Sequence, residues 1–277
     1  MRYRMKLKLI ALDLDGTLTN DRKEITPKTK EILMELQRNG TRLALASARP
    51  APGLLSVCDE LQMREFGGIL MSYNGGRIVD AASDETLYLT TMDEEETRGI
   101  LHFLEALPVN VILDDGKQFY VTDPEAYKVA YECWNNNMTC TKVENLGGFL
   151  SFAPVKLLMS VHEEKIDAVQ KIIAEKLPPT LSVVRTAPFY LEIIPTSIDK
   201  GKGLRDVCAV LGIDVSETAA FGDAENDIPM IRTAAFGVAM GNSDEAVKEA
   251  ADFVTLSNNE DGIAYALLVG QGDGPHD

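Results

Sequence analysis

The chain has 277 residues, of which 45% are hydrophobic and 25% charged, a globular composition large enough for a main core and a second lobe. Its formal net charge of -16 argues against a nucleic-acid partner, because such proteins need a basic surface or patch. No apolar run approaches the length of a membrane span, and the four cysteines lack metal-ligand spacing. We therefore expect a cytoplasmic protein with reduced thiols and no membrane partner.

The first predicted strand, residues 9–12, is followed directly by Asp13-Leu14-Asp15-Gly16-Thr17. Side chains at i and i+2 of an extended segment point to the same face, so Asp13 and Asp15 are expected to converge where the strand ends. Two crowded carboxylates require a cation or a shared proton. Gly16 allows a sharp turn, and the Thr17 hydroxyl is expected to hold that turn. An Asp-rich turn without function is the alternative interpretation.

The next segments predict a parallel βαβ unit. Thr26-Pro27 is typical of a helix start, and helical spacing of apolar residues continues to Gly40. A buried strand at residues 42–46 ends at Ser47. A helix at 52–61, a strand at 68–72, a turn at 73–76 and a strand at 77–79 follow.

From about residue 83 the pattern predicts an α+β lobe with an open sheet and helices on one face. The expected strands are residues 86–89, 109–113, 118–121, 156–161, 181–184 and 190–194. The expected helices are residues 93–107 and 163–177, with a third at 124–135.

After residue 195 the α/β pattern returns. The expected helices begin at 199 and 226 and, capped by Ser243, near 244; the expected strands are 218–221, 235–239 and 253–255. Residues 271–277 lack apolar side chains and are expected to be mobile. The sequence thus predicts a discontinuous core domain, residues 1–82 and 195–277, with a second domain, residues 83–194, inserted in it.

Polar clusters recur at the predicted strand ends and helix starts of the core. They are Asp13 with Asp15, Ser47, Lys200, and Asp223 with Asp227. Each has an ordinary explanation, such as a helix cap for Ser47 or a solvated first-turn lysine for Lys200. Ligands of open parallel sheets bind at the carboxyl ends of the strands, so the joint occurrence favours a binding site.

These motifs resemble the haloacid dehalogenase (HAD) superfamily, and within it the Cof-type phosphatases with a C2B cap. Residues 13–17 look like its first motif, Ser47 its second, Lys200 its third and residues 222–227 its fourth, with residues 237–242 similar to the segment that follows. Cof-type members usually have Thr-Gly-Arg at the second motif, whereas this chain has Ser47-Ala48-Arg49. The serine keeps the hydroxyl, whereas the alanine has less backbone freedom than the usual glycine.

The resemblance implies a Rossmann-like α/β core with an inserted α+β cap, and a hydrolase that forms an aspartyl phosphate. Asp13 would be the nucleophile and Asp15 the general acid and base. The cofactor would be Mg²⁺, held by Asp13, Asp223 and the backbone carbonyl of Asp15, with Asp227 as a ligand or close by.

For phosphate binding the resemblance implies Ser47, Lys200 and Asn226. Arg49 is either a substrate contact or a surface arginine before a proline. Asn74 is a candidate substrate contact near the cap junction, although Asn-Gly is a standard turn signal and the turn interpretation is favoured.

The expected function is a Mg²⁺-dependent phosphatase of small phosphorylated metabolites, with sugar phosphates favoured by resemblance. One alternative is a phosphosugar mutase of the same superfamily, which would isomerise a hexose phosphate with little phosphate release. Another is a phosphometabolite-binding regulator, disfavoured because Asp13, Asp15 and Asp223 are all present. The sequence does not indicate the oligomeric state.

Overall fold

The computed structural model describes residues 6–270, so the expectation for residues 271–277 lies outside the described part. The chain forms two compact units. Unit 1 contains the residues up to Ala48, then Leu54–Tyr88 and the residues from Asp199 on, and unit 2 contains Arg49–Gly53 and Leu89–Ile198. The predicted roles of a core and a cap for residues 1–82 with 195–277 and for residues 83–194 stay predictions.

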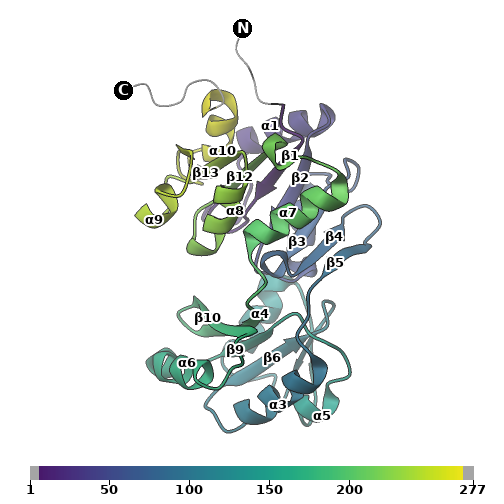
Figure 1. Ribbon diagram of the computed structural model, residues 1–277, viewed down its shortest axis with the longest axis vertical. Coiled ribbons are helices and arrows are strands. Elements are labelled where there is room, and N and C mark those ends of the chain that lie inside the picture. Colours follow the sequence, from purple (N-terminus) through teal and green to yellow (C-terminus); the bar gives the residue numbers. More distant parts are fainter. Residues whose placement is uncertain (1–5, 271–277) are drawn as a thin grey trace. The chain divides into compact units, whose positions relative to one another are not determined.

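Unit 1 is built on an eight-stranded sheet of order β14-β13-β12-β1-β2-β3-β4-β5 (Figure 1). The strands are β1 Leu9–Leu12, β2 Arg42–Ala46, β3 Ile69–Ser72, β4 Arg77–Asp80, β5 Thr86–Leu89, β12 Thr218–Gly222, β13 Phe236–Ala239 and β14 Phe253–Val254. Neighbouring strands from β14 to β3 run parallel, and β4 runs antiparallel to β3. The carboxyl ends of β1, β2 and β12 therefore share one edge of the sheet.

Helices cover both faces of this sheet, with α7 and α8 in front of it and α1 behind it in Figure 1. The α-helices of unit 1 are α1 Pro27–Arg38, α2 Leu55–Glu60, α7 Lys200–Leu211, α8 Ile228–Thr233, α9 Glu245–Lys248 and α10 Gly262–Tyr265. Leu204 and Val207 of α7 and Met230 of α8 pack with Leu9 and Ala11 of β1 in one buried cluster. The alternate β1 residues Ile10 and Leu12 are also fully buried, as expected of a strand covered on both faces.

Unit 2 has a six-stranded sheet of order β10-β11-β9-β6-β7-β8. Its strands are β6 Asn110–Asp114, β7 Phe119–Val121, β8 Cys140–Lys142, β9 Leu157–Ser160, β10 Leu181–Ala187 and β11 Tyr190–Pro195, and its α-helices are α3 Glu94–Leu104, α4 Val129–Asn136, α5 Leu146–Phe149 and α6 Ile166–Ala174. Leu101 of α3 and Ile166 of α6 share a cluster with Leu157 of β9, whereas Val129 of α4 packs with Leu158 on the alternate face. The predicted α/β class with an α+β insertion is confirmed. The expectation that its helices lie on one face of the sheet was wrong, because α4 packs on the face opposite α3 and α6.

Four local expectations were wrong or incomplete. The strand expected at 86–89 in the inserted lobe is β5, which is the edge strand of the unit 1 sheet next to β4. The helix expected at 124–135 begins at Val129, because the Asp123 side chain accepts the backbone N–H of Glu125 at 3.1 Å and favours a turn there. The helix expected to be capped by Ser243 has Asp244 at its N-cap. The short elements β8 and α5 were not predicted.

Among residues 6–270, no helix combines the length and the apolarity that crossing a membrane would require.

Candidate active site

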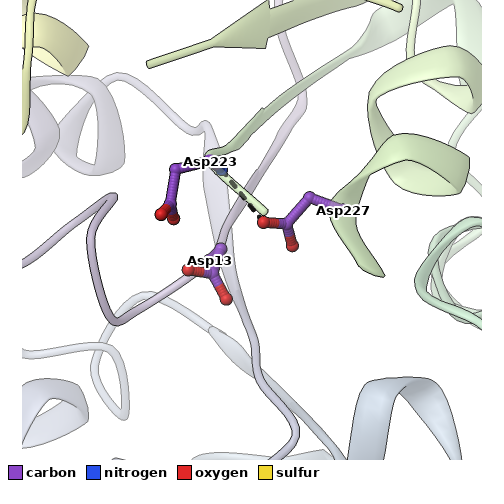
Figure 2. A group of neighbouring side chains, drawn as sticks. All are labelled: Asp13, Asp223 and Asp227. Atoms are coloured by element: carbon purple, nitrogen blue, oxygen red, sulfur yellow. Dashed lines mark hydrogen bonds between the residues drawn. The ribbon is translucent and has the colours of Figure 1, made fainter. Parts of the chain in front are cut away.

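Three carboxylates meet at the edge of the unit 1 sheet. Asp13 follows β1 and donates its backbone N–H to Phe221 O of β12 at 3.0 Å, Asp223 follows β12, and Asp227 lies in the 3-10 turn Glu225–Asp227. One carboxylate oxygen of each lies within 4.8 Å of the others. Figure 2 shows the three side chains converging from β1, from the end of β12 and from the turn before α8.

Lys200 connects two of these carboxylates. Its Nζ lies 2.6 Å from Asp13 Oδ1 and 2.5 Å from Asp227 Oδ1, and its side chain is 0% exposed. The Asp199 side chain caps α7 by accepting the backbone N–H of Lys202 at 2.8 Å, and this cap fixes where the helix begins. The N-cap thus places Lys200 at the first position of α7, against the end of β1.

Asp227 is bound through both of its oxygens. Oδ1 accepts from Lys200, and Oδ2 accepts the backbone N–H groups of Asp223 and Ala224, each at 3.0 Å. Asp223 is oriented in turn by Thr17, whose hydroxyl donates to its Oδ1 at 2.7 Å. This geometry gives Asp227 an orienting role and leaves Asp13 and Asp223 as the carboxylates better placed for a ligand.

The cluster brings three carboxylates together around one ammonium group, that of Lys200. Burial, and then the neighbouring Asp227 carboxylate, raise the pKa of Asp13 well above its ordinary value, although Lys200 acts in the opposite direction. Burial also raises the pKa of Asp223. Burial opposes the charged form of Lys200, but the carboxylates of Asp13 and Asp227 outweigh it and raise the pKa of Lys200. The cluster therefore favours a further cation.

The donor set fits a hard divalent cation such as Mg²⁺. Asp13, Asp223 and Asp227 offer carboxylate oxygens, which Mg²⁺ prefers together with water and phosphate oxygens. A cation there would stabilise the charged forms of Asp13 and Asp223, which burial and the neighbouring carboxylate of Asp227 disfavour. The Asp15 side chain is not in this group; its expected contribution is through the backbone carbonyl.

The predicted phosphate-binding residues Ser47 and Asn226 are linked through Asn74. Ser47 follows β2 and is 4% exposed, and its backbone oxygen accepts the N–H of Asn74 at 2.8 Å. Asn226 Nδ2 donates to Asn74 Oδ1 at 3.1 Å. Asn74 has a positive φ of 56°, in agreement with a turn residue. The residue therefore serves the turn and also joins the β2 and β12 ends.

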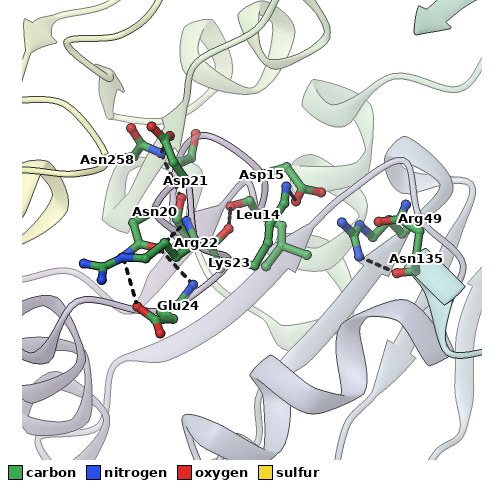
Figure 3. A network of polar contacts seen from close by, with 12 residues as sticks. Leu14, Asp15, Asn20, Asp21, Arg22, Lys23, Glu24, Arg49, Asn135 and Asn258 are labelled. Atoms are coloured by element: carbon green, nitrogen blue, oxygen red, sulfur yellow. Dashed lines mark hydrogen bonds and ion pairs between the residues drawn. The ribbon is translucent and has the colours of Figure 1, made fainter. Parts of the chain in front are cut away.

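The structure also gives partners for the remaining candidates, Asp15 and Arg49. Asp15 makes a bridge to Thr19, and its side chain, 36% exposed, pairs with Lys23 (Figure 3). Arg49 belongs to unit 2, where its guanidinium donates to Asn135 O at 2.7 Å. Its predicted substrate contact stays untested.

Sequence reasoning missed several residues that shape the site. Thr17 was expected to hold its own turn but binds Asp223, a contact that only the pairing of β1 with β12 creates. Asn242, within the segment already noted at 237–242, donates from Nδ2 to Gly16 O at 2.9 Å. Lys23 and Asn258 carried no sequence signal.

Comparison with known proteins identifies the family. The family model described as haloacid dehalogenase-like hydrolase matches residues 10–267, and the chain belongs to this family. The Bacillus subtilis putative phosphatase YkrA is 31% identical, with 95% of this chain and 97% of the relative covered. A putative phosphatase of Streptococcus pyogenes is 28% identical over 95% of this chain and 98% of its own length.

Two solved structures extend the likeness to the whole fold. A haloacid dehalogenase-like hydrolase from Bacteroides thetaiotaomicron is 36% identical with a TM-score of 0.89, over 95% of this chain and 99% of that one. A sugar phosphatase described as HAD subclass IIB is 28% identical with a TM-score of 0.76, over 94% and 98% of the two chains. The protein is a hydrolase of phosphate esters.

Proposed function

We propose that the protein is a Mg²⁺-dependent phosphatase of small phosphorylated metabolites, with sugar phosphates as the favoured class, and that it acts through an aspartyl phosphate. The observation that carries the proposal is the buried Lys200 ammonium held 2.6 Å from Asp13, beside Asp223. A carboxylate fixed in this way is poised to attack an anionic phosphorus centre, because the neighbouring cations offset the charge repulsion.

The likeness to named relatives supports the substrate class. The subclass IIB relative is named a sugar phosphatase. A Bacillus subtilis relative, 29% identical over 94% of this chain, is named 5-amino-6-(5-phospho-D-ribitylamino)uracil phosphatase. Both names describe phosphate esters of sugars or sugar alcohols, whose alkoxide leaving groups need a proton. The predicted cytoplasmic location stays a prediction.

In the first step Asp13 attacks phosphorus, forming the bond from its carboxylate oxygen to phosphorus while the ester P–O bond breaks. Asp15 gives its proton to the departing oxygen, which leaves as an alcohol. Lys200, in contact with Asp13 Oδ1, fixes the direction of attack and offsets negative charge on the phosphoryl oxygens.

In the second step a water molecule attacks the phosphorus of the aspartyl phosphate. Asp15, now a carboxylate, accepts a proton from this water as the Asp13–phosphorus bond breaks and inorganic phosphate is released. Ser47 and Asn226 would donate hydrogen bonds to the phosphoryl oxygens. Asp227 holds Lys200 and the 223–224 backbone throughout.

Bound Mg²⁺ would supply Lewis-acid stabilisation of the phosphoryl oxygens. The residues proposed to hold it are Asp13, Asp223 and the Asp15 backbone carbonyl, with Asp227 at the same cluster.

The test is phosphate release from a panel of sugar phosphates, nucleotides and cofactor phosphates with added Mg²⁺. We expect one or more sugar phosphates to be hydrolysed fastest. Asp13→Asn should lower kcat on the order of 10⁴-fold or more, because the amide cannot form the aspartyl phosphate. A matched control is Asp167→Asn in unit 2, whose side chain is 88% exposed and pairs only at the surface with Arg185.

Full activity in Asp13→Asn would contradict the covalent mechanism. Isomerisation of a hexose phosphate with little phosphate release would favour the mutase instead. Binding of a sugar phosphate without turnover by the wild-type protein would favour a regulator.

A further inference from the structure

Four hydrogen bonds of Asn20 close the turn that follows the Asp13-Asp15 loop. Asn20 is buried, and its side-chain oxygen accepts the backbone N–H groups of Arg22 at 2.9 Å and Glu24 at 3.0 Å. Its backbone N–H donates to Glu24 O, and its backbone oxygen accepts the N–H of Lys23, each at 2.9 Å. These bonds close the turn and hold Lys23 in the left-handed region at φ 63°.

Two further asparagines, Asn242 and Asn258, connect the chain just before this turn to the C-terminal part of unit 1. Asn258, 6% exposed, donates from Nδ2 to Thr19 O at 3.0 Å, just before the turn. Its backbone N–H donates to Asn242 Oδ1 at 3.0 Å, and Asn242 Nδ2 donates to Gly16 O at 2.9 Å. The same chain of bonds therefore holds the loop that carries Asp15 and the turn that carries Lys23.

The result of this arrangement is a fixed contact between Lys23 and Asp15. Lys23 Nζ lies 2.6 Å from Asp15 Oδ1, with the two side chains 60% and 36% exposed (Figure 3). An ion pair this exposed contributes little to stability. A lysine at positive φ costs free energy that glycine or asparagine would avoid. Stability alone does not account for lysine at this position, and strained residues concentrate at functional sites.

We propose that Lys23 is a positioning residue for the general acid of the reaction. This inference rests on the proposed role of Asp15. An ammonium group only donates hydrogen bonds, so the oxygen that it contacts, Oδ1, serves as an acceptor. The contact therefore fixes the orientation of the Asp15 carboxyl group, and the ammonium stabilises the carboxylate that proton transfer leaves behind. In the first step the O–H bond of the Asp15 carboxyl group breaks as the bond from hydrogen to the leaving oxygen forms, while Lys23 holds the carboxyl group in place through its contact with Oδ1.

The test compares two leaving groups. One substrate is p-nitrophenyl phosphate, whose leaving group is stable as an anion, and the other is the sugar phosphate that the wild-type protein hydrolyses fastest. Lys23→Met should lower kcat for the sugar phosphate about 10- to 100-fold, a part of the factor that general acid catalysis supplies, with KM unchanged. Its kcat for p-nitrophenyl phosphate should stay within about twofold, because this leaving group does not need the proton.

Three variants separate positioning from a structural role. Lys23→Arg should recover most of the activity, because it restores a cationic donor. Lys23→Gly suits φ 63° and removes the ammonium, so its thermal stability should equal or exceed that of the wild type while its sugar-phosphate turnover falls. Arg22→Met, on the same turn with a side chain 82% exposed, should behave as the wild type on both substrates.

Equal losses on both substrates in Lys23→Met, or no loss on either, would overturn the proposal. So would full sugar-phosphate turnover in Lys23→Gly. A further variant, Asp15→Asn, separates failure of the positioning role of Lys23 from failure of the proposed function. If Asp15→Asn loses sugar-phosphate turnover and Lys23→Met does not, only the positioning role fails. If Asp15→Asn keeps that turnover, the general-acid assignment itself fails.

Discussion

Asp13 and Asp15 are two positions apart, yet their surroundings differ. Asp13 is 8% exposed and contacts the buried ammonium of Lys200. Asp15 is partly exposed and contacts Lys23, an ammonium in solvent. Burial and the fixed cation suit Asp13 for attack, and access to solvent suits Asp15 for exchange of a proton with water. Gly16 lies between Asp15 and Thr17, and its backbone geometry explains why this loop can come so close to Asp223.

Gly16 has φ 86°, and a Cβ added to it would overlap the Asp223 carboxylate. Gly16→Ala should therefore destabilise the fold by about 1–2 kcal/mol through backbone strain and lower kcat/KM about 100-fold by displacing Asp223. Urea unfolding and steady-state kinetics measure the two effects.

Gly40→Ala is the matched control for this change. Gly40 has a similar φ of 92°, but nothing lies within 4 Å of an added Cβ. Gly40→Ala should lower the free energy of unfolding through backbone strain but leave kcat/KM unchanged. Equal kinetic losses in both variants would contradict the explanation.

At the scale of elements, the least expected feature is the charged interior of unit 2. Lys156 Nζ lies 2.6 Å from Glu192 Oε1, with side chains 5% and 6% exposed. Glu132 of α4 lies nearby and accepts from Asn136 Nδ2 at 2.7 Å. Burial, opposed by Lys156 and reinforced by Glu192, raises the pKa of Glu132 above its ordinary value of 4.5.

A glutamate with a raised pKa in the folded state stabilises the fold fully below pH 4.5 and loses that contribution as pH rises through the raised pKa. Glu132→Gln keeps the acceptor for Asn136 and removes the charge. It should raise the free energy of unfolding at pH 7 on the order of 1 kcal/mol and flatten the decline of stability above pH 4.5. Urea unfolding of both proteins from pH 4 to 8 measures this; a less stable variant with an unchanged pH slope would contradict it.

The long elements could be predicted from the sequence because their signals are local. Pro27 after Thr26 marks the start of α1, and Asp199 caps α7. The Asp13, Ser47, Lys200 and Asp223 positions followed from strand ends and from resemblance. The four-residue helix α5 and the three-residue strand β8 could not be predicted, because segments this short show no clear hydrophobic period. The Lys23 contact depends on a turn closed by a buried asparagine, which periodicity does not describe.

At the scale of the whole molecule, the net charge is -16. A divalent cation bound at the carboxylate cluster offsets part of this charge, and its binding should stabilise the folded protein. Mg²⁺ bound to the folded protein alone should stabilise it by about 2.7 kcal/mol at one hundred times the dissociation constant, raising Tm by about 5 °C. Calorimetry with and without Mg²⁺ measures this shift, and EDTA should abolish phosphate release until Mg²⁺ is added back.

Asp223→Asn should remove most of the Mg²⁺-dependent shift in Tm, whereas Asp167→Asn in unit 2 should keep it. Activity that survives chelation, together with a Tm insensitive to Mg²⁺, would contradict the metal assignment.

The position of β1 between β2 and β12 also delays completion of the unit 1 sheet while the chain is being synthesised. Leu9 pairs with Arg42 on one side but with Thr218 on the other. At ordinary translation rates, about 200 residues take roughly 10–40 s to synthesise. During that interval the nascent sheet has one open, strongly apolar edge, the kind of surface that templates aggregation and that chaperones cover. Stop codons or stalls before residue 218 should therefore yield insoluble fragments and not partly active enzyme.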